Sequence, residues 1–149
     1  YWTHETILAE REGYEVSLMR VEAWGVPDYY ELVLVTGEEV IASRPGVIRA
    51  LLNATQRGYL DAIEEPDAAL DALAKAYEGI DREVEERGLE LLIPVWTDGG
   101  IGFGTQTLER WEAYAGWMKS RGLIPADLDV SKAFTTEFLP DAHGTPVAT

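Results

Sequence analysis

The sequence predicts a fold of the α/β class, with few strands and several packed helices. Residues 14–21 alternate polar and apolar side chains, and residues 30–36 include a continuous apolar run, so both segments have the pattern of strands. Most other segments repeat apolar residues at helical spacing. Two strands are too few for a self-contained sheet in a chain of 149 residues. We therefore expect the remaining strands to lie upstream.

Proline and glycine mark the ends of the predicted helices. Gly13 should end a first helix over residues 3–12, and residues 37–39 should form a turn. Ser43 is the expected N-cap of a long helix that has Pro45 in its first turn. Pro94 is expected to end a later helix. After the long helix, helical patterns occupy residues 66–79, 81–93, 107–122 and 129–136.

The termini predict that the chain is part of a longer protein. It begins Tyr1-Trp2-Thr3, without an initiator Met or a leader pattern, so we expect a fragment. Residues 141–149 lack periodicity and are predicted to be a flexible tail. No apolar run approaches the length of a membrane span.

Composition excludes several classes of function. The net charge is −15, and residues 61–90 alone hold eleven acidic against three basic side chains, a net −8. Nucleic acid would be repelled, because phosphate binding needs clustered Lys and Arg. The acidic stretch is interpreted as a solvated helical face. The chain has no Cys, which excludes thiol catalysis, disulfides and zinc-thiolate sites.

An aromatic and acidic group of residues is the candidate ligand site. Aromatic faces stack on planar ligands, and carboxylates accept hydrogen bonds from ring amino groups, so this mixture suits a nitrogenous heterocycle. The alternative is that the aromatic rings are core residues at a strand end. The candidate residues are Trp2, Glu5, Asp28, Tyr29 and Tyr30.

Other motifs point to structure rather than chemistry. The glycine-rich segment 99–104 lacks the Lys-Ser or Lys-Thr of a phosphate loop and is interpreted as a turn. No serine lies in a Gly-x-Ser-x-Gly elbow, and neither histidine has metal-ligand spacing. We therefore predict no catalytic residue, no metal and no cofactor. Three aromatic residues at helical spacing favour packing over a cofactor site: Trp111, Tyr114 and Trp117.

A series of short motifs extends from residue 1 to about 140. The motifs are Trp2-Thr3-His4-Glu5, Gly25-Val26-Pro27-Asp28-Tyr29-Tyr30, Pro45-Gly46-Val47-Ile48, Gly58-Tyr59-Leu60-Asp61-Ala62-Ile63-Glu64-Glu65-Pro66, Thr97-Asp98-Gly99-Gly100, Glu109-Arg110-Trp111, and Ala133 to Pro140. Together they resemble the carboxyl-terminal half of the NMT1/THI5-like family. The members of this family are thiamine-pyrimidine-precursor-binding proteins of bacterial ABC importers, related to the fungal pyrimidine synthase.

This resemblance implies a two-lobed fold of the type II periplasmic-binding-protein kind, with the ligand held between the lobes. Residues 1–29 would form the end of the second lobe and the approach to the hinge, and residues 30–140 the carboxyl-terminal part of the first lobe. Trp2 and Glu5 match the family's aromatic-plus-Glu motif. His4 departs from the aromatic residue expected there, which bears on the exact ring that is recognised.

The resemblance also implies a function. The protein would be a non-enzymatic, extracytoplasmic binding component that delivers a small heteroaromatic ligand to an ABC permease. Riboflavin, another small solute or a sulfonate are alternative ligands, although the acidic residues disfavour an anion. Two further alternatives are a pyrimidine-forming enzyme of the fungal type, whose Cys-rich iron motif has no equivalent here, and a ligand sensor that takes no part in transport.

Overall fold

The structure is a computed structural model and describes residues 1–97 and 104–140. The tail 141–149 and all but Gly104 of the turn expected at 99–104 lie outside the described residues. Eight helices form within the described ranges: α1 (Glu5–Arg11), the 3-10 helix η1 (Val21–Trp24), α2 (Glu38–Ser43), α3 (Pro45–Glu64), α4 (Pro66–Ala76), α5 (Arg82–Thr97), α6 (Leu108–Ser120) and the 3-10 helix η2 (Val130–Lys132).

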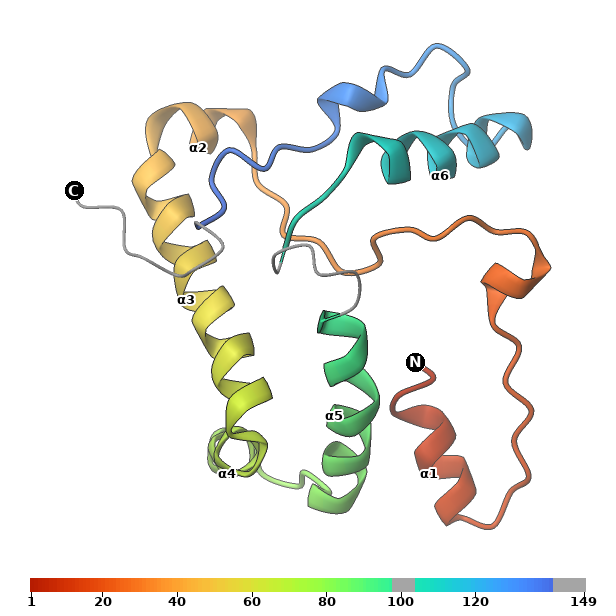
Figure 1. The fold of residues 1–149 in the computed structure, drawn as a ribbon, viewed down its shortest axis with the longest axis vertical. Coiled ribbons are helices and arrows are strands. Elements are labelled where there is room, and N and C mark those ends of the chain that lie inside the picture. Colours follow the sequence, from red (N-terminus) through yellow and green to blue (C-terminus); the bar gives the residue numbers. More distant parts are fainter. Residues whose placement is uncertain (98–103, 141–149) are drawn as a thin grey trace.

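The helices pack as a chain of neighbours (Figure 1). α3 contacts α4, α4 contacts α5, and α1 lies against α5, while α2 packs on the start of α3. α6 and η2 form a second packed pair. A long irregular segment leads from α1 through η1 to α2 and passes between these two groups of helices. This segment carries the predicted residues Asp28, Tyr29 and Tyr30.

The two predicted strands are wrong for this structure. Neither 14–21 nor 30–36 forms a strand, and the described residues contain no β-sheet. A strand exists only by pairing with another strand about 4.8 Å away. Neither segment finds such a neighbour among the described residues. The predicted α/β class is thus represented here by its helices alone.

Three predicted helix boundaries also need correction. The turn expected at 37–39 is instead the start of α2, whose first turn carries two glutamates that suit the positive helix end. Ser43 does not cap α3; its hydroxyl donates to the carbonyl of Glu39, and Arg44 holds the N-cap position. α5 continues past Pro94 to Thr97. A proline removes its own N–H, but residues after it can still donate to earlier carbonyls.

Other local predictions are confirmed. Pro45 and Pro66 occupy the first turns of α3 and α4, where a missing N–H costs nothing. α6 begins where the helical pattern was predicted to begin, and the structure adds that the hydroxyl of Thr107 caps it by accepting from the amide of Arg110 at 3.4 Å. Gly122 ends α6 with a φ of 66°, a left-handed conformation that favours glycine. Within the part of the chain that is described, none of the helices is both long and apolar enough to span a membrane.

Much apolar surface remains uncovered. The chain exposes 11223 Å², whereas a compact monomer of 16.5 kDa exposes about 7500 Å². Leu32 and Val35 are 77% and 87% exposed. On α3, Val47 and Leu51 lie one turn apart and are 62% and 56% exposed. The apolar run 32–35 and this face of α3 therefore have the composition of a protein core but are exposed in this structure.

Candidate functional site

Trp2 lies three residues before the start of α1 and is half-buried. The guanidinium carbon of Arg20 lies 4.7 Å from the centroid of its ring, a distance at which a cation is attracted to an aromatic face. The hydroxyl of Thr6 donates to the carbonyl oxygen of Trp2 at 2.5 Å and fixes the backbone there. One face of the indole is thus occupied by a cation. A planar ligand would stack on the other face or displace Arg20.

Glu5 is exposed at the start of α1. A backbone hydrogen bond to the Glu5 carboxylate favours its ionised form. Its position in the first helical turn favours the anion as well. Near neutral pH the side chain is therefore a hydrogen-bond acceptor.

α5 holds the helix that carries Trp2 and Glu5. Gly88 of α5 is buried and faces the backbone of Thr3: a Cβ built on Gly88 would lie 2.7 Å from the Thr3 carbonyl oxygen. The absence of a side chain at Gly88 therefore permits this close approach. Two ion pairs also join α1 to the start and middle of α5, Arg11 with Asp81 and Arg87 with Glu10 at 2.8 Å, and Nε2 of His4 lies 3.5 Å from the carboxylate of Glu85.

Tyr30 anchors the beginning of α6. Its hydroxyl accepts a hydrogen bond from the amide of Thr107 at 2.9 Å. The guanidinium carbon of Arg110 lies 5.0 Å from the ring centroid, and the Trp111 ring is tilted by 40° at 5.9 Å. The hydroxyl and the ring of Tyr30 are thus both engaged with α6.

Tyr29 stacks on the same helix, one turn further along. Its ring lies 4.6 Å from the ring of Tyr114 with an angle of 14° between the planes. Burial raises the pKa of the Tyr29 phenol, and Glu31, Tyr114, Glu22 and Tyr1 add to the effect.

The five predicted residues thus fall into two groups. Trp2 and Glu5 belong to the start of α1, whereas Tyr29 and Tyr30 pack against α6. Asp28 is exposed, and its side chain makes no hydrogen bond or ion pair with the described residues. Within 1–97 and 104–140, no hydrogen bond, ion pair or ring contact joins the two groups, so the five residues do not form one closed pocket here.

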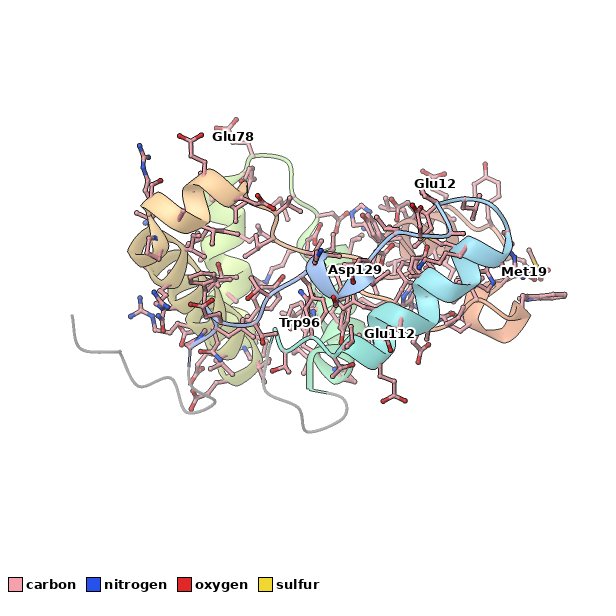
Figure 2. All side chains as sticks on the ribbon, turned by 90° about the horizontal axis from the view of Figure 1, so that it is seen from above. Glu12, Met19, Glu78, Trp96, Glu112 and Asp129 are labelled. Carbon is pink, nitrogen blue, oxygen red and sulfur yellow. The ribbon has the colours of Figure 1, made fainter. Side chains whose placement is uncertain are left out.

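Two surface hollows lie elsewhere. One of about 250 Å³ separates α6 from η2, where Glu112 and Asp129 stand on its two walls (Figure 2). The other, of about 140 Å³, lies between α4 and α5 and is lined by Leu70, Leu89 and acidic residues. Neither is lined by any of the five predicted residues. In the described part of the chain, no three His, Asp or Glu side chains are grouped to hold a metal ion.

Sequence reasoning missed two contacts of the candidate residues. Arg20 was not expected to cover Trp2, because Arg20 belongs to residues 14–21, which the sequence predicts to be a strand. The aromatic spacing of α6 correctly indicated packing, as Trp111 stacks on Phe134 at 5.5 Å and Tyr114 on Trp117 at 5.8 Å. That spacing did not reveal that the partners of this packing include Tyr29 and Tyr30.

Comparison with known proteins decides the family. Residues 1–69 match the family described as NMT1/THI5 like. Over these residues the chain belongs to the NMT1/THI5-like family. This confirms the resemblance found in the sequence, and the matched region contains all five candidate residues.

Three curated relatives extend the comparison of this NMT1/THI5-like chain. It is 30% identical to the formylaminopyrimidine-binding protein of Halalkalibacterium halodurans over 91% of this chain and 42% of that protein. It is 27% identical to the riboflavin-binding protein RibY of Chloroflexus aurantiacus, over 94% of this chain and 41% of that protein. A Legionella pneumophila protein named 4-amino-5-hydroxymethyl-2-methylpyrimidine phosphate synthase is 24% identical over 69% of this chain and 31% of that protein. The chain thus spans about two fifths of the first two relatives.

Proposed function

We propose that this chain is part of a solute-binding protein that delivers an aminopyrimidine precursor of thiamine to an ABC permease. The observation that carries the proposal is the 30% identity, over 91% of this chain, to a protein named for formylaminopyrimidine binding. The acidic and aromatic candidate residues fit that ligand class. Rings stack on aromatic side chains, and an ionised carboxylate accepts hydrogen bonds from a ring amino group.

Each candidate residue has a role in this proposal. Trp2 offers the ring face that Arg20 leaves free. Glu5 accepts a hydrogen bond from the exocyclic amino group, and Asp28 provides a second acceptor without a competing partner among the described residues. Tyr29 adds a second aromatic face. Tyr30 has a supporting role, since its hydroxyl is bonded to the backbone of α6.

The pocket would close between two lobes. We assign residues 1–29 to the end of one lobe and the approach to the hinge, and residues 30–140 to the other lobe. The exposed apolar run 32–35 and the exposed face of α3 support this assignment, because both have the composition of a sheet and its covering helix. Strands outside these 149 residues would complete that sheet. Such a receptor would act outside the cytoplasm, where the permease takes over its ligand.

Riboflavin is the alternative ligand. The observation that favours it is the 27% identity to RibY over 94% of this chain. Riboflavin is also a planar nitrogenous ring system, so aromatic stacking by Trp2 and Tyr29 would serve it equally well. It absorbs visible light, and a yellow protein after purification would support this alternative directly.

We propose binding without catalysis. Two of the three relatives are named as binding proteins, and the third is named as a synthase. A binding protein releases its ligand unchanged, whereas a synthase forms the pyrimidine itself. Recovery of an unchanged aminopyrimidine after prolonged incubation, checked by mass spectrometry, would support the receptor, whereas formation of a pyrimidine by the protein itself would contradict it.

Equilibrium dialysis of the intact protein tests the ligand class. The panel contains an aminopyrimidine, riboflavin and an alkyl sulfonate, and mass spectrometry identifies what the protein retains. The proposal expects retention of the aminopyrimidine, and the alternative expects riboflavin. Retention of the sulfonate alone would overturn both, because the acidic candidate residues disfavour an anion.

A further inference from the structure

A stack of aromatic rings runs along α6 and ends at Tyr29. Tyr29 and Tyr114 are nearly parallel at 4.6 Å and 14°, and Tyr114 and Trp117 are nearly parallel at 5.8 Å and 8°. The guanidinium carbon of Arg121 lies 4.3 Å from the centroid of Trp117. Parallel, offset stacking and a cation over an indole face are both favourable arrangements. The plane of Tyr29 is therefore set by α6 rather than by its own irregular segment.

Tyr29 differs from its neighbour Tyr30 in what it leaves free. Tyr30 uses its hydroxyl for Thr107 and its ring for Arg110 and Trp111. Tyr29 has one stacking partner among the described residues, Tyr114, and that contact occupies one ring face. Its second face makes no ring or cation contact with the described residues. Of the two tyrosines, Tyr29 can stack a ligand without breaking a contact.

We infer that Tyr114 is a positioning residue for ligand binding, which holds the plane of Tyr29 so that a heteroaromatic ring stacks on its free face. This inference rests on the proposed function. Trp117 and Arg121 act one step further away, by fixing Tyr114. Tyr114 itself would not touch the ligand, because Tyr29 lies between them.

The physical reason is pre-organisation. A ring on an irregular segment rotates about its side-chain bonds, and ordering it on ligand binding costs conformational entropy. Stacking on a rigid helix removes that cost before the ligand arrives. Loss of the Tyr114 ring should therefore weaken ligand binding through Tyr29 and through no other residue of the site.

A double-mutant cycle in the intact protein tests this coupling. The variants are Tyr29→Ala, Tyr114→Ala and both together, titrated calorimetrically with an aminopyrimidine and with riboflavin. We expect Tyr114→Ala to weaken binding by roughly 2- to 12-fold, the range of one aromatic pair. In the Tyr29→Ala background, the same change should have no further effect. Tyr114→Phe keeps the ring and should bind within about twofold of wild type, as the retained stacking predicts.

Two controls separate positioning from general stability. Tyr77→Ala removes an exposed aromatic ring outside the stack, and it should leave affinity unchanged. Should Tyr114→Ala fail to fold, Tyr114→Leu keeps the bulk but not the stack, and it should show the same weakening. Thermal unfolding of every variant shows that the folded protein is being titrated.

The outcomes are distinct. If wild type binds neither ligand, the proposed function fails and this inference falls with it. If wild type binds but Tyr114→Ala binds equally well, only the inference is overturned. The inference is overturned as well if Tyr114→Ala weakens binding equally with and without Tyr29, because Tyr114 would then act by another route.

Discussion

The carbonyl oxygen of Thr3 lies 2.7 Å from the position that a Cβ on Gly88 would occupy. Thr3 lies between Trp2 and Glu5 in the sequence. The close approach of α5 to Thr3 therefore fixes the positions of Trp2, the proposed stacking residue, and Glu5, the proposed hydrogen-bond acceptor. Alanine normally stabilises a helix relative to glycine by about 1 kcal/mol. At position 88 the clash with a backbone atom reverses that sign.

Gly88→Ala should therefore lower the free energy of unfolding by about 1–3 kcal/mol, the usual cost of overpacking. Denaturant unfolding of the intact protein measures it. Gly58→Ala in α3 is the matched control, since a Cβ there meets nothing within 4 Å and should raise stability by about 0.5–1 kcal/mol. Equal stabilisation by both substitutions would contradict the packing of α1 on α5.

Glu5→Gln should weaken binding of an aminopyrimidine by about tenfold or more, because a charged acceptor becomes a neutral one. Glu12→Gln is the control: it removes the same charge from an exposed residue just after α1 whose side chain has no hydrogen bond or ion pair with the described residues. Calorimetric titration of both variants gives the comparison. If they bind alike, Glu5 does not belong to the site.

Tyr30→Phe should cost about 1 kcal/mol of stability while leaving the ring in place, because the amide of Thr107 loses its acceptor. The midpoint of thermal unfolding is the measurement. The exposed Tyr77→Phe serves as control and should not change it. A Tyr30→Phe protein as stable as wild type would show that this hydrogen bond does not hold the start of α6.

The ion pair of Arg11 with Asp81 predicts a dependence on pH. The hydrogen bond from Arg11 lowers the pKa of Asp81 below its ordinary value of 3.8. Because the folded-state pKa is the lower one, the stabilisation is fully present above pH 3.8 and is lost as pH falls through the folded-state value. Wild type should therefore have a larger free energy of unfolding than Asp81→Asn near neutral pH, and this difference should disappear in acid. Unfolding curves at several pH values measure this, with exposed Asp127→Asn as control; a difference that does not change with pH would contradict the ion pair.

Local chemistry explains which elements could be predicted from the sequence. Pro45, Pro66 and Gly122 act on their own backbone dihedral angles, so the ends of α3, α4 and α6 are visible in the sequence. The run 32–35 has strand composition, but a strand also needs a partner, and none is present among the described residues. Composition alone carries no information about that partner.

The candidate site was predictable in composition but not in arrangement. Aromatic and acidic residues near Trp2 and Tyr29 indicated a heterocycle, and the family match includes them. The contacts that distinguish Tyr29 from Tyr30 come from α6, more than 75 residues later in the chain, as the Tyr30 hydroxyl to Thr107 contact illustrates with a separation of 77 residues. Contacts at that separation follow from the fold and leave no local pattern.

Calorimetric titration of the intact protein with a formylaminopyrimidine tests the central claim most directly. A receptor of the proposed kind should bind it in a 1:1 ratio, and Trp2→Ala should weaken that binding while Trp24→Ala, an exposed indole at 75%, should not. Absence of binding by the folded protein, or binding that Trp2→Ala and Trp24→Ala affect equally, would contradict the account.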